Sequence, residues 1–314
     1  MGGARRAGIG SVHNAVMHHA ILGSGGVGGT VGTCLAHVSE RVTMVVRPGT
    51  LDRFPREVRL ESPLLGNFSA GVDKAEKVPA CDVLWIAVKA RQLEDALRSA
   101  PDPSSVKAVV PLLNGIDHVA RLRAVFGQER VIPATIAGEM ERVAPGRFVH
   151  PSPFAMLNVG GSGQALLGDV LAQLEKLGFS CRFVGDEKTL MWNKLVFLGP
   201  FALVTSAAGV PIGEVLENAT WREKLEKCIR EFCSIALAEG AQVNTEKVVA
   251  AYSLVPKDMR SSMQKDVDRG NAPELDAIGG PVLRGGERHR IPVPVTRELA
   301  AAVERRAQVA SQRA

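Results

Sequence analysis

The feature that most constrains this chain is a glycine-rich turn between a short apolar strand and a helical segment. The turn reads Gly23-Ser24-Gly25-Gly26-Val27-Gly28 and follows the predicted strand His18–Leu22. In such a G-x-G-x-x-G turn, Gly23 permits the tight bend, Gly25 lets a diphosphate approach the backbone, and Gly28 lets the helix pack on the sheet. The unpaired N–H groups at the helix N-terminus favour an anion. The six residues of this turn therefore predict a dinucleotide-binding site.

The end of the next strand indicates which dinucleotide is bound. The predicted strand Val42–Val46 is followed by Arg47, at the place where an NAD site carries an acidic residue for the ribose 2′-hydroxyl. A guanidinium there suits a 2′-phosphate instead, because it can donate several charge-assisted hydrogen bonds to it. We therefore expect NADPH/NADP+ as the cofactor. The alternative is an arginine that only solvates the end of a strand.

The first half of the chain alternates short apolar runs with helical segments, which is typical of βαβ units with a parallel sheet. The strands expected after the first two are Val83–Val88, Val106–Leu112, Val131–Thr135, Gly146–Val159 and Phe179–Val184, with Val58–Phe68 as an antiparallel excursion. The helices expected are Gly26–Val38, Gln92–Ala100, Gly115–Phe126 and Ala165–Leu177. This pattern predicts a Rossmann-type dinucleotide-binding domain over residues 17–185.

From residue 186 to residue 314 the pattern is helical, with glycine and proline breaks and little sign of strands. We therefore expect an α/β chain in which an all-α domain follows the Rossmann-type domain. Residues 1–16 precede the first strand and are interpreted as a leader or an extended start. Substrate is expected between the domains, at the carboxyl ends of the strands.

Composition excludes several classes of protein. The chain has 314 residues, 46% hydrophobic and 23% charged, and its formal charge of +5 is spread without a basic block. It has a single tyrosine, and no aromatic and basic stacking platform is evident, so we expect no nucleic-acid partner. We also expect no membrane span. The five scattered cysteines contain no C-x-x-C pair, which indicates a cytoplasmic protein with reduced thiols and no metal site.

Two polar loops follow predicted strands and should lie at the same edge of the sheet. Lys89 and Gln92 come after one strand, and Asn114 comes after the next. A lysine there can meet a cofactor phosphate or a substrate carboxylate, and an asparagine amide can bind nicotinamide or a substrate oxygen. Taken singly, these residues also fit a solvated loop and a simple turn.

The helical half offers candidates for proton transfer. Lys194 is embedded in an apolar run, where it either extends to solvent or is desolvated, and desolvation would lower its pKa and make it a usable acid. Ser262 and Glu274 are too far apart to act together on one helix. Gly270 can end the first helix and Pro273 can begin the next, so the chain can fold back and bring both residues to one site. Otherwise Glu274 only stabilises a helix N-terminus.

Taken in order, these motifs make the chain similar to the ketopantoate reductase family, the NADPH-dependent 2-dehydropantoate 2-reductases, from about Met17 onward. Besides the residues above, the resemblance rests on Leu113-Asn114-Gly115, Trp192-Asn193-Lys194-Leu195, Ser261-Ser262-Met263, Pro273-Glu274-Leu275-Asp276, Gly279 and Pro294. It implies a helical domain like that of 6-phosphogluconate dehydrogenase. By the same resemblance, Lys194 is the general acid and Glu274 assists it and holds substrate. Ser262 binds the substrate carboxylate, and Lys89 and Asn114 bridge cofactor and substrate.

The sequence departs from the family at positions that contact substrate. The family usually has asparagines one and two helical turns after the catalytic lysine and again further on, where this chain has Leu198, Ala202 and Ile212. Losing these contacts weakens recognition of a hydroxylated substrate.

Three functions therefore stay open. The first is reduction of ketopantoate to pantoate in pantothenate and coenzyme A biosynthesis. The second is reduction of a less polar 2-oxo acid or ketone, and the third is an NADP(H)-binding protein without activity. The expected partner is a small 2-oxo acid, and a homodimer is an assembly that the resemblance allows.

Overall fold

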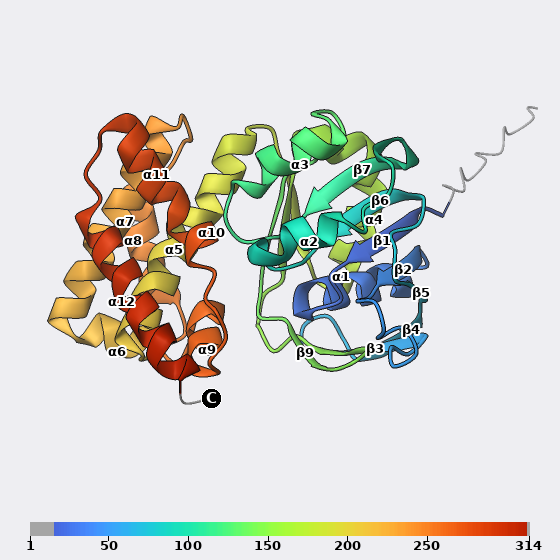
Figure 1. The fold of residues 1–314 in the computed structure, drawn as a ribbon, viewed down its shortest axis with the longest axis horizontal. Coiled ribbons are helices and arrows are strands. Elements are labelled where there is room, and N and C mark those ends of the chain that lie inside the picture. The colour runs from blue at the N-terminus through green and yellow to red at the C-terminus, as the bar shows by residue number, and fades with distance from the viewer. Residues whose placement is uncertain (1–15, 313–314) are drawn as a thin grey trace, which may run out of the picture.

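The computed structural model describes residues 16–312, which form a strand-containing domain and a helical domain (Figure 1). The strand-containing domain ends with β12 (Ser180–Val184), and the helical domain begins with α5 (Glu187–Ala208). The boundary expected at residue 185 falls in the short connection between these elements. The expected leader, residues 1–16, lies outside the described residues except for Val16.

The centre of the first domain is a parallel sheet with the strand order β5-β2-β1-β6-β7. These strands are β1 (His18–Leu22), β2 (Arg41–Val45), β5 (Asp73–Ala75), β6 (Cys81–Ile86) and β7 (Val106–Pro111). The chain runs outward from β1 to β5 and then returns to the other side of β1. The order therefore reverses between β1 and β6, which is where ligands bind in open α/β sheets.

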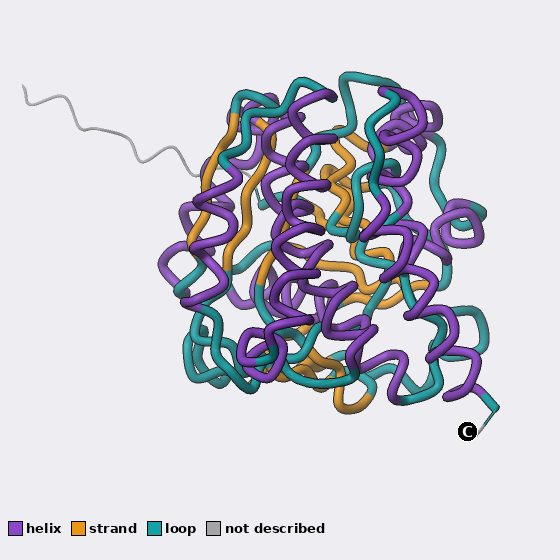
Figure 2. Tube along the Cα trace, turned by 90° about the vertical axis from the view of Figure 1, so that its left-hand side faces the viewer, coloured by secondary structure: helices purple, strands orange, loops and turns teal. Residues whose placement is uncertain are grey.

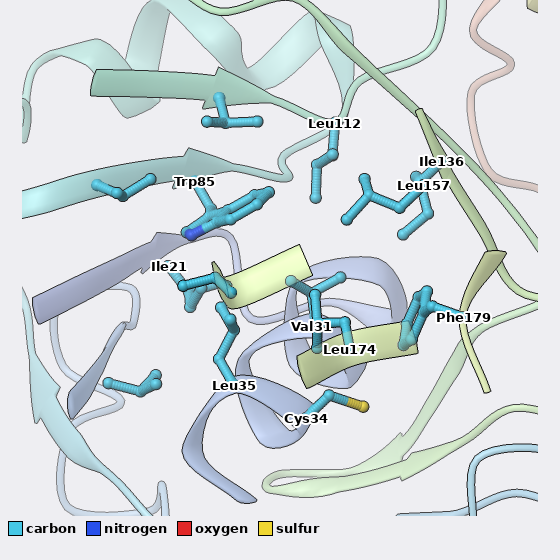
Figure 3. Packing of buried hydrophobic residues seen from close by; sticks show 14 of the residues in the cluster. Ile21, Val31, Cys34, Leu35, Trp85, Leu112, Ile136, Leu157, Leu174 and Phe179 are labelled. Carbon is cyan, nitrogen blue, oxygen red and sulfur yellow. The ribbon is translucent and has the colours of Figure 1, made fainter. Parts of the chain in front are cut away.

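Both faces of this sheet are buried, because alternate strand residues point to opposite sides. Ile21 and Trp85 face the core shared with α1 (Gly26–His37) and α4 (Gln164–Leu177), as Figure 3 shows. Leu22 and Leu84 face the core on the other side. The helices on that side are α2 (Leu93–Leu97) and α3 (His118–Phe126). These packed faces fix the carboxyl ends of the strands from which the polar loops leave.

Two smaller sheets flank the central one. In the first, β4 (Phe68–Gly71), β3 (Glu57–Glu61), β10 (Arg147–Val149) and β9 (Glu141–Ala144) are adjacent in that order. In the second, β11 (Met156–Gly160) lies between β12 and β8 (Ala134–Ala137). The expected antiparallel excursion after residue 58 is confirmed by the pairing of β3 with β4.

Several element boundaries differ from the sequence analysis. The strand expected at Val83–Val88 is Cys81–Ile86, and the helix expected at Gln92–Ala100 is Leu93–Leu97. Three other differences have a local reason. The helix expected from Gly115 begins at His118, because Gly115 has a φ of +83°, which an α-helix excludes. The expected strand from Val131 begins at Ala134, and Val131 makes only an isolated parallel bridge. The stretch Gly146–Val159 is divided between β10 and β11, which belong to different sheets, and two prolines lie between them.

The helical domain packs its helices around α5. Figure 2 shows the helices of this domain in purple, on the side that faces the viewer. The other helices, labelled in Figure 1, are α6 (Ile212–Glu217), α7 (Ala219–Ala238), α8 (Thr245–Ala251), α9 (Ser262–Asp268), α10 (Leu275–Ile278), α11 (Gly280–His289) and α12 (Pro294–Ser311). Gly199 lets α7 approach α5, since a Cβ there would lie 2.0 Å from Cε1 of Phe232. Because α5 also contacts α6, α9, α10 and α12, it is the central helix of the domain.

Of the helices between residues 16 and 312, α5 is the one that is long and apolar enough to cross a bilayer, with a mean hydropathy of 1.3 over its most apolar window. The protein itself buries 72% of that window. The central helix of a folded helical domain must be buried by the helices around it. The sequence analysis did not single out this helix.

Candidate active site at the domain interface

The glycine-rich turn has the geometry that the motif predicts. Gly23 has a φ of +106°, and a Cβ there would lie 2.8 Å from the backbone of Ala87. A Cβ on Gly28 would lie 2.1 Å from the carbonyl oxygen of Gly23, so the helix can pack on the turn only without a side chain. At Gly25, by contrast, an added Cβ would meet nothing within 4 Å. Gly23 and Gly28 therefore shape the turn, while Gly25 leaves open space beside the backbone.

The start of α1 suits an anion. Within the described residues, no side chain caps the helix at Gly25, and the first turn contains no acidic residue. Its leading N–H groups and the positive end of the helix dipole are therefore available to a ligand. Ser24 and Val27 complete the turn, Ser24 being almost fully buried. These features fit the diphosphate of a dinucleotide.

The other expected cofactor residues lie at the edge of the same sheet. Arg47 follows β2 and is exposed, and its guanidinium has no ion-pair partner in the described part of the chain. Gln92 ends a short 3₁₀ turn after β6, and its backbone N–H donates to the carbonyl oxygen of Lys89. Both side chains remain available to a ligand, and their binding roles stay predictions.

Three expected site residues form one hydrogen-bonded chain between the domains. Lys194 of α5 donates from Nζ to Oδ1 of Asn114 over 3.0 Å. Asn114, in the loop after β7, donates from Nδ2 to Oε2 of Glu274 over 3.2 Å. The other oxygen of Glu274 accepts from the backbone N–H of Ala90 at 3.0 Å. The chain fixes the orientation of the Asn114 amide and holds the ammonium and the carboxylate on either side of it.

The surroundings of Lys194 make it a usable acid. Desolvation by burial lowers its pKa from 10.5 to about 8, and the charge of Glu274 acts in the opposite direction. His118 at the start of α3 is buried and has an unpartnered Nε2. Burial and the nearby charge of Lys194 lower the pKa of His118 to about 4, so the ring is neutral at neutral pH. The charged groups of the site beside Asn114 are therefore Lys194 and Glu274. The sequence analysis did not identify His118.

Ion pairs join α9 to the strand-containing domain. Lys89 pairs with Asp266, and Lys265 pairs with Glu139 and, at 3.5 Å, with Glu141. Sequence reasoning found Lys89 but missed Asp266 and Lys265. A signal for Asp266 was available, because it lies four residues after Ser262 and therefore on the same helical face.

Ser262 is the exposed first residue of α9, and the neighbouring Ser261 is the buried residue that caps the helix. The chain reverses at Gly270, whose φ of +72° ends the helical region as expected. Pro273 precedes Glu274, the residue before α10, and so does not occupy the first helical turn as expected. The role of Ser262 as a carboxylate ligand stays a prediction.

The three residues that replace the usual asparagines are in different surroundings. Leu198 is half-buried and lies one turn after Lys194, on the same face of α5. Ala202 is 1% exposed and Ile212 is fully buried, and both belong to the core of the helical domain. Of the three, Leu198 is therefore the one placed to touch a substrate beside Lys194.

A Rossmann-type sheet, a glycine-rich turn and a helical domain that supplies a lysine define a class of two-domain oxidoreductases. The sequence profile described as ketopantoate reductase PanE/ApbA matches residues 19–161, and the profile of its C-terminal domain matches residues 186–307. The chain therefore belongs to the ketopantoate reductase family, as its motifs predicted.

Curated relatives support this assignment. The chain is 29% identical over 288 residues to the 2-dehydropantoate 2-reductase of Caulobacter vibrioides, which covers 88% of this chain and 94% of that protein. It is also 25% identical over 289 residues to the uncharacterized oxidoreductase YkpB of Bacillus subtilis, covering 89% and 95%. Both matches extend through the two domains.

Solved structures share the fold. The PanE/ApbA family ketopantoate reductase of Ralstonia eutropha superposes with a TM-score of 0.83 at 22% identity, covering 94% of this chain and 99% of that one. D-mandelate dehydrogenase, solved with NADH and anilino(oxo)acetate, gives 0.82 at 19% with the same coverage. A dimeric ketopantoate reductase of Staphylococcus aureus gives 0.74 at 18%, covering 93% and 99%. At these identities the likeness is one of fold.

Proposed function

We propose that the protein is an NADPH-dependent reductase of a 2-oxo acid, with ketopantoate as the substrate and pantoate as the product, in pantothenate and coenzyme A biosynthesis. The observation that carries the proposal is the chain of Lys194, Asn114 and Glu274 at the domain interface, with a lysine pKa of about 8. An acid of this strength is well matched to proton transfer near neutral pH.

NADPH, when bound, supplies the hydride for the substrate carbonyl carbon. Lys194 gives a proton to the carbonyl oxygen, on which negative charge develops, and its ammonium stabilises that charge before the proton is transferred. Asn114 orients Lys194 through its amide oxygen. Glu274 keeps the lysine protonated by its charge and is itself held by two N–H donors. Ser262 would bind the substrate carboxylate, as the family resemblance implies.

Arg47 supports NADPH as the preferred cofactor, because an exposed guanidinium after β2 favours a 2′-phosphate. The fold neighbour D-mandelate dehydrogenase was solved with NADH, so NADH is the cofactor to compare with NADPH. Size-exclusion chromatography with light scattering tests the expected homodimer, for which the dimeric S. aureus enzyme is a precedent.

A second substrate class has support from Leu198. An apolar side chain one turn after Lys194 offers no hydrogen bond to a substrate hydroxyl and favours an apolar or aromatic group at that place. D-mandelate dehydrogenase, crystallised with anilino(oxo)acetate, has the same fold. We therefore propose a less polar 2-oxo acid as the alternative substrate.

One assay separates these proposals. NADPH oxidation is followed at 340 nm with ketopantoate and with a panel of aliphatic and aromatic 2-oxo acids, and kcat/KM is compared. The highest value with ketopantoate supports the first proposal, and the highest value with an apolar acid supports the second. Binding of NADPH without turnover of any acid would contradict both and favour the NADP(H)-binding protein without activity.

The role of Lys194 is tested in the same assay. Lys194→Ala should lower kcat by about a hundredfold or more, the usual effect of losing a general acid. Lys188→Ala is the matched control, because Lys188 is on the same helix but is exposed and donates to the carbonyl oxygen of Glu239. Equal turnover by both variants would refute the assignment.

A further inference from the structure

The loop between β8 and β9 lies directly against the glycine-rich turn. A Cβ on Gly26 would be 2.0 Å from the carbonyl oxygen of Met140, so the two backbones are in close contact. Two residues further on, Arg142 of β9 donates from Nη1 to the carbonyl oxygen of Ser24, at 3.4 Å. Figure 1 shows β9 beside the start of α1. An arginine from a distant segment therefore reaches the turn that is expected to bind a diphosphate.

The guanidinium of Arg142 has unused capacity. It carries N–H groups for five hydrogen bonds, and its contact with Ser24 is a long one. Among residues 16–312 no carboxylate forms an ion pair with it, and the neighbouring Glu141 pairs with Lys265. Arg147 on the next strand differs, because it pairs with Glu61. Arg142 is thus an exposed cation that reaches the turn and whose charge is not neutralised by the described residues.

The turn itself has no cation of its own. It offers backbone N–H groups and a helix dipole, whereas the diphosphate of a dinucleotide carries two negative charges. Two lysines near this edge are already paired, Lys89 with Asp266 and Lys265 with Glu139. Arg47 lies after β2, where it is expected to meet the ribose 2′-phosphate. Arg142 is therefore a cation that contacts the turn directly and is placed to meet the diphosphate.

We propose that Arg142 is a cofactor-binding residue that contacts the diphosphate of the bound dinucleotide beside the glycine-rich turn. The planar guanidinium can donate two parallel hydrogen bonds to phosphate oxygens. The contact with Ser24 holds the side chain in place for this purpose. This inference rests on the proposed function, because it requires that the protein binds a nicotinamide dinucleotide.

The test is the affinity of the full-length protein for NADPH and NADH, measured by titration calorimetry. Arg142→Ala should raise both dissociation constants by about tenfold to a hundredfold, since both cofactors share the diphosphate. Arg47→Ala should raise the constant for NADPH alone. Inorganic pyrophosphate should compete with NADPH in the unaltered protein and much less in Arg142→Ala. Arg142→Lys should recover part of the affinity.

Arg147→Ala is the matched control, because it removes an exposed arginine from the adjacent strand without touching the turn. Thermal midpoints of all variants exclude loss of folding as the cause. If the unaltered protein binds NADPH and Arg142→Ala binds it within twofold of the same affinity, the role of Arg142 is overturned and the proposed function stands. If the unaltered protein binds neither cofactor, both are overturned.

Discussion

The pKa of Lys194 gives the sharpest prediction about the proposed reaction. Burial lowers this pKa to about 8. Reduction requires the protonated lysine, so activity should be constant below this pH and fall as the pH rises through it. With a pKa of about 8, the protonated fraction falls roughly tenfold between pH 7 and pH 9. A lysine with the ordinary pKa would lose only a few per cent over the same range.

The assay is kcat/KM for the best 2-oxo acid at saturating NADPH, in overlapping buffers from pH 6.5 to pH 10. Glu274→Gln should move the decline to lower pH, because the carboxylate of Glu274 raises the pKa of Lys194. Glu94→Gln is the matched control, since Glu94 is exposed on α2 and pairs with Arg121. It should leave the profile unchanged.

Two results would refute this reasoning. The first is a decline centred near pH 10.5, which would mean that Lys194 is not desolvated. The second is a decline that Glu274→Gln leaves in place or moves upward, which would mean that the carboxylate does not act on the lysine. A higher KM in Glu274→Gln, with kcat and the pH profile unchanged, would leave Glu274 a role in binding substrate only.

Four further predictions concern the glycine-rich turn, Leu198 and Arg47. Gly23→Ala should lower the free energy of unfolding, measured with urea, by about 1–3 kcal/mol. The reason is that Gly23 has a φ of +106° and that an added Cβ would strike the backbone of Ala87. Gly25→Ala should leave the stability nearly unchanged and weaken NADPH binding in calorimetry, because its Cβ would enter open space. Leu198→Asn should raise kcat/KM for ketopantoate relative to apolar 2-oxo acids, and an unchanged ratio would remove Leu198 from the substrate site. Arg47→Ala should lower the preference for NADPH over NADH. The same preference in the unaltered protein and in the variant would show that Arg47 only solvates the end of the strand.

The parts of the site that could be predicted from sequence are those that a local pattern specifies. Gly23 and Gly28 could be placed from the local strand, turn and helix, since Gly23 has a positive φ and a Cβ on Gly28 would strike the carbonyl oxygen of Gly23. The close approach of Ala87 to Gly23 comes from a distant segment. Lys89 and Asn114 could be placed at one edge because each follows a parallel strand. The fold class followed from the same alternation of strands and helices.

The parts that sequence did not reveal depend on segments far apart in the chain. Asp266, Lys265 and Arg142 acquire partners only when α9 meets the loop after β8 and when that loop meets the glycine-rich turn. No periodic pattern in the sequence specifies which distant segments pack against each other. His118 was missed for a related reason, since its burial beside Lys194 depends on how α3 packs against α5.

The hydrogen-bonded chain through Asn114 also bears on how this protein can change over evolution. Lys194 and Asn114 are 80 residues apart, and Asn114 and Glu274 are 160 apart, with Asn114 in one domain and both partners in the other. Neither domain holds the whole hydrogen-bonded chain of the proposed proton donor. A recombination event that replaced one whole domain with that of a distant homologue would have to keep the hydrogen bonds among Lys194, Asn114 and Glu274. This requirement favours inheritance of the two domains together.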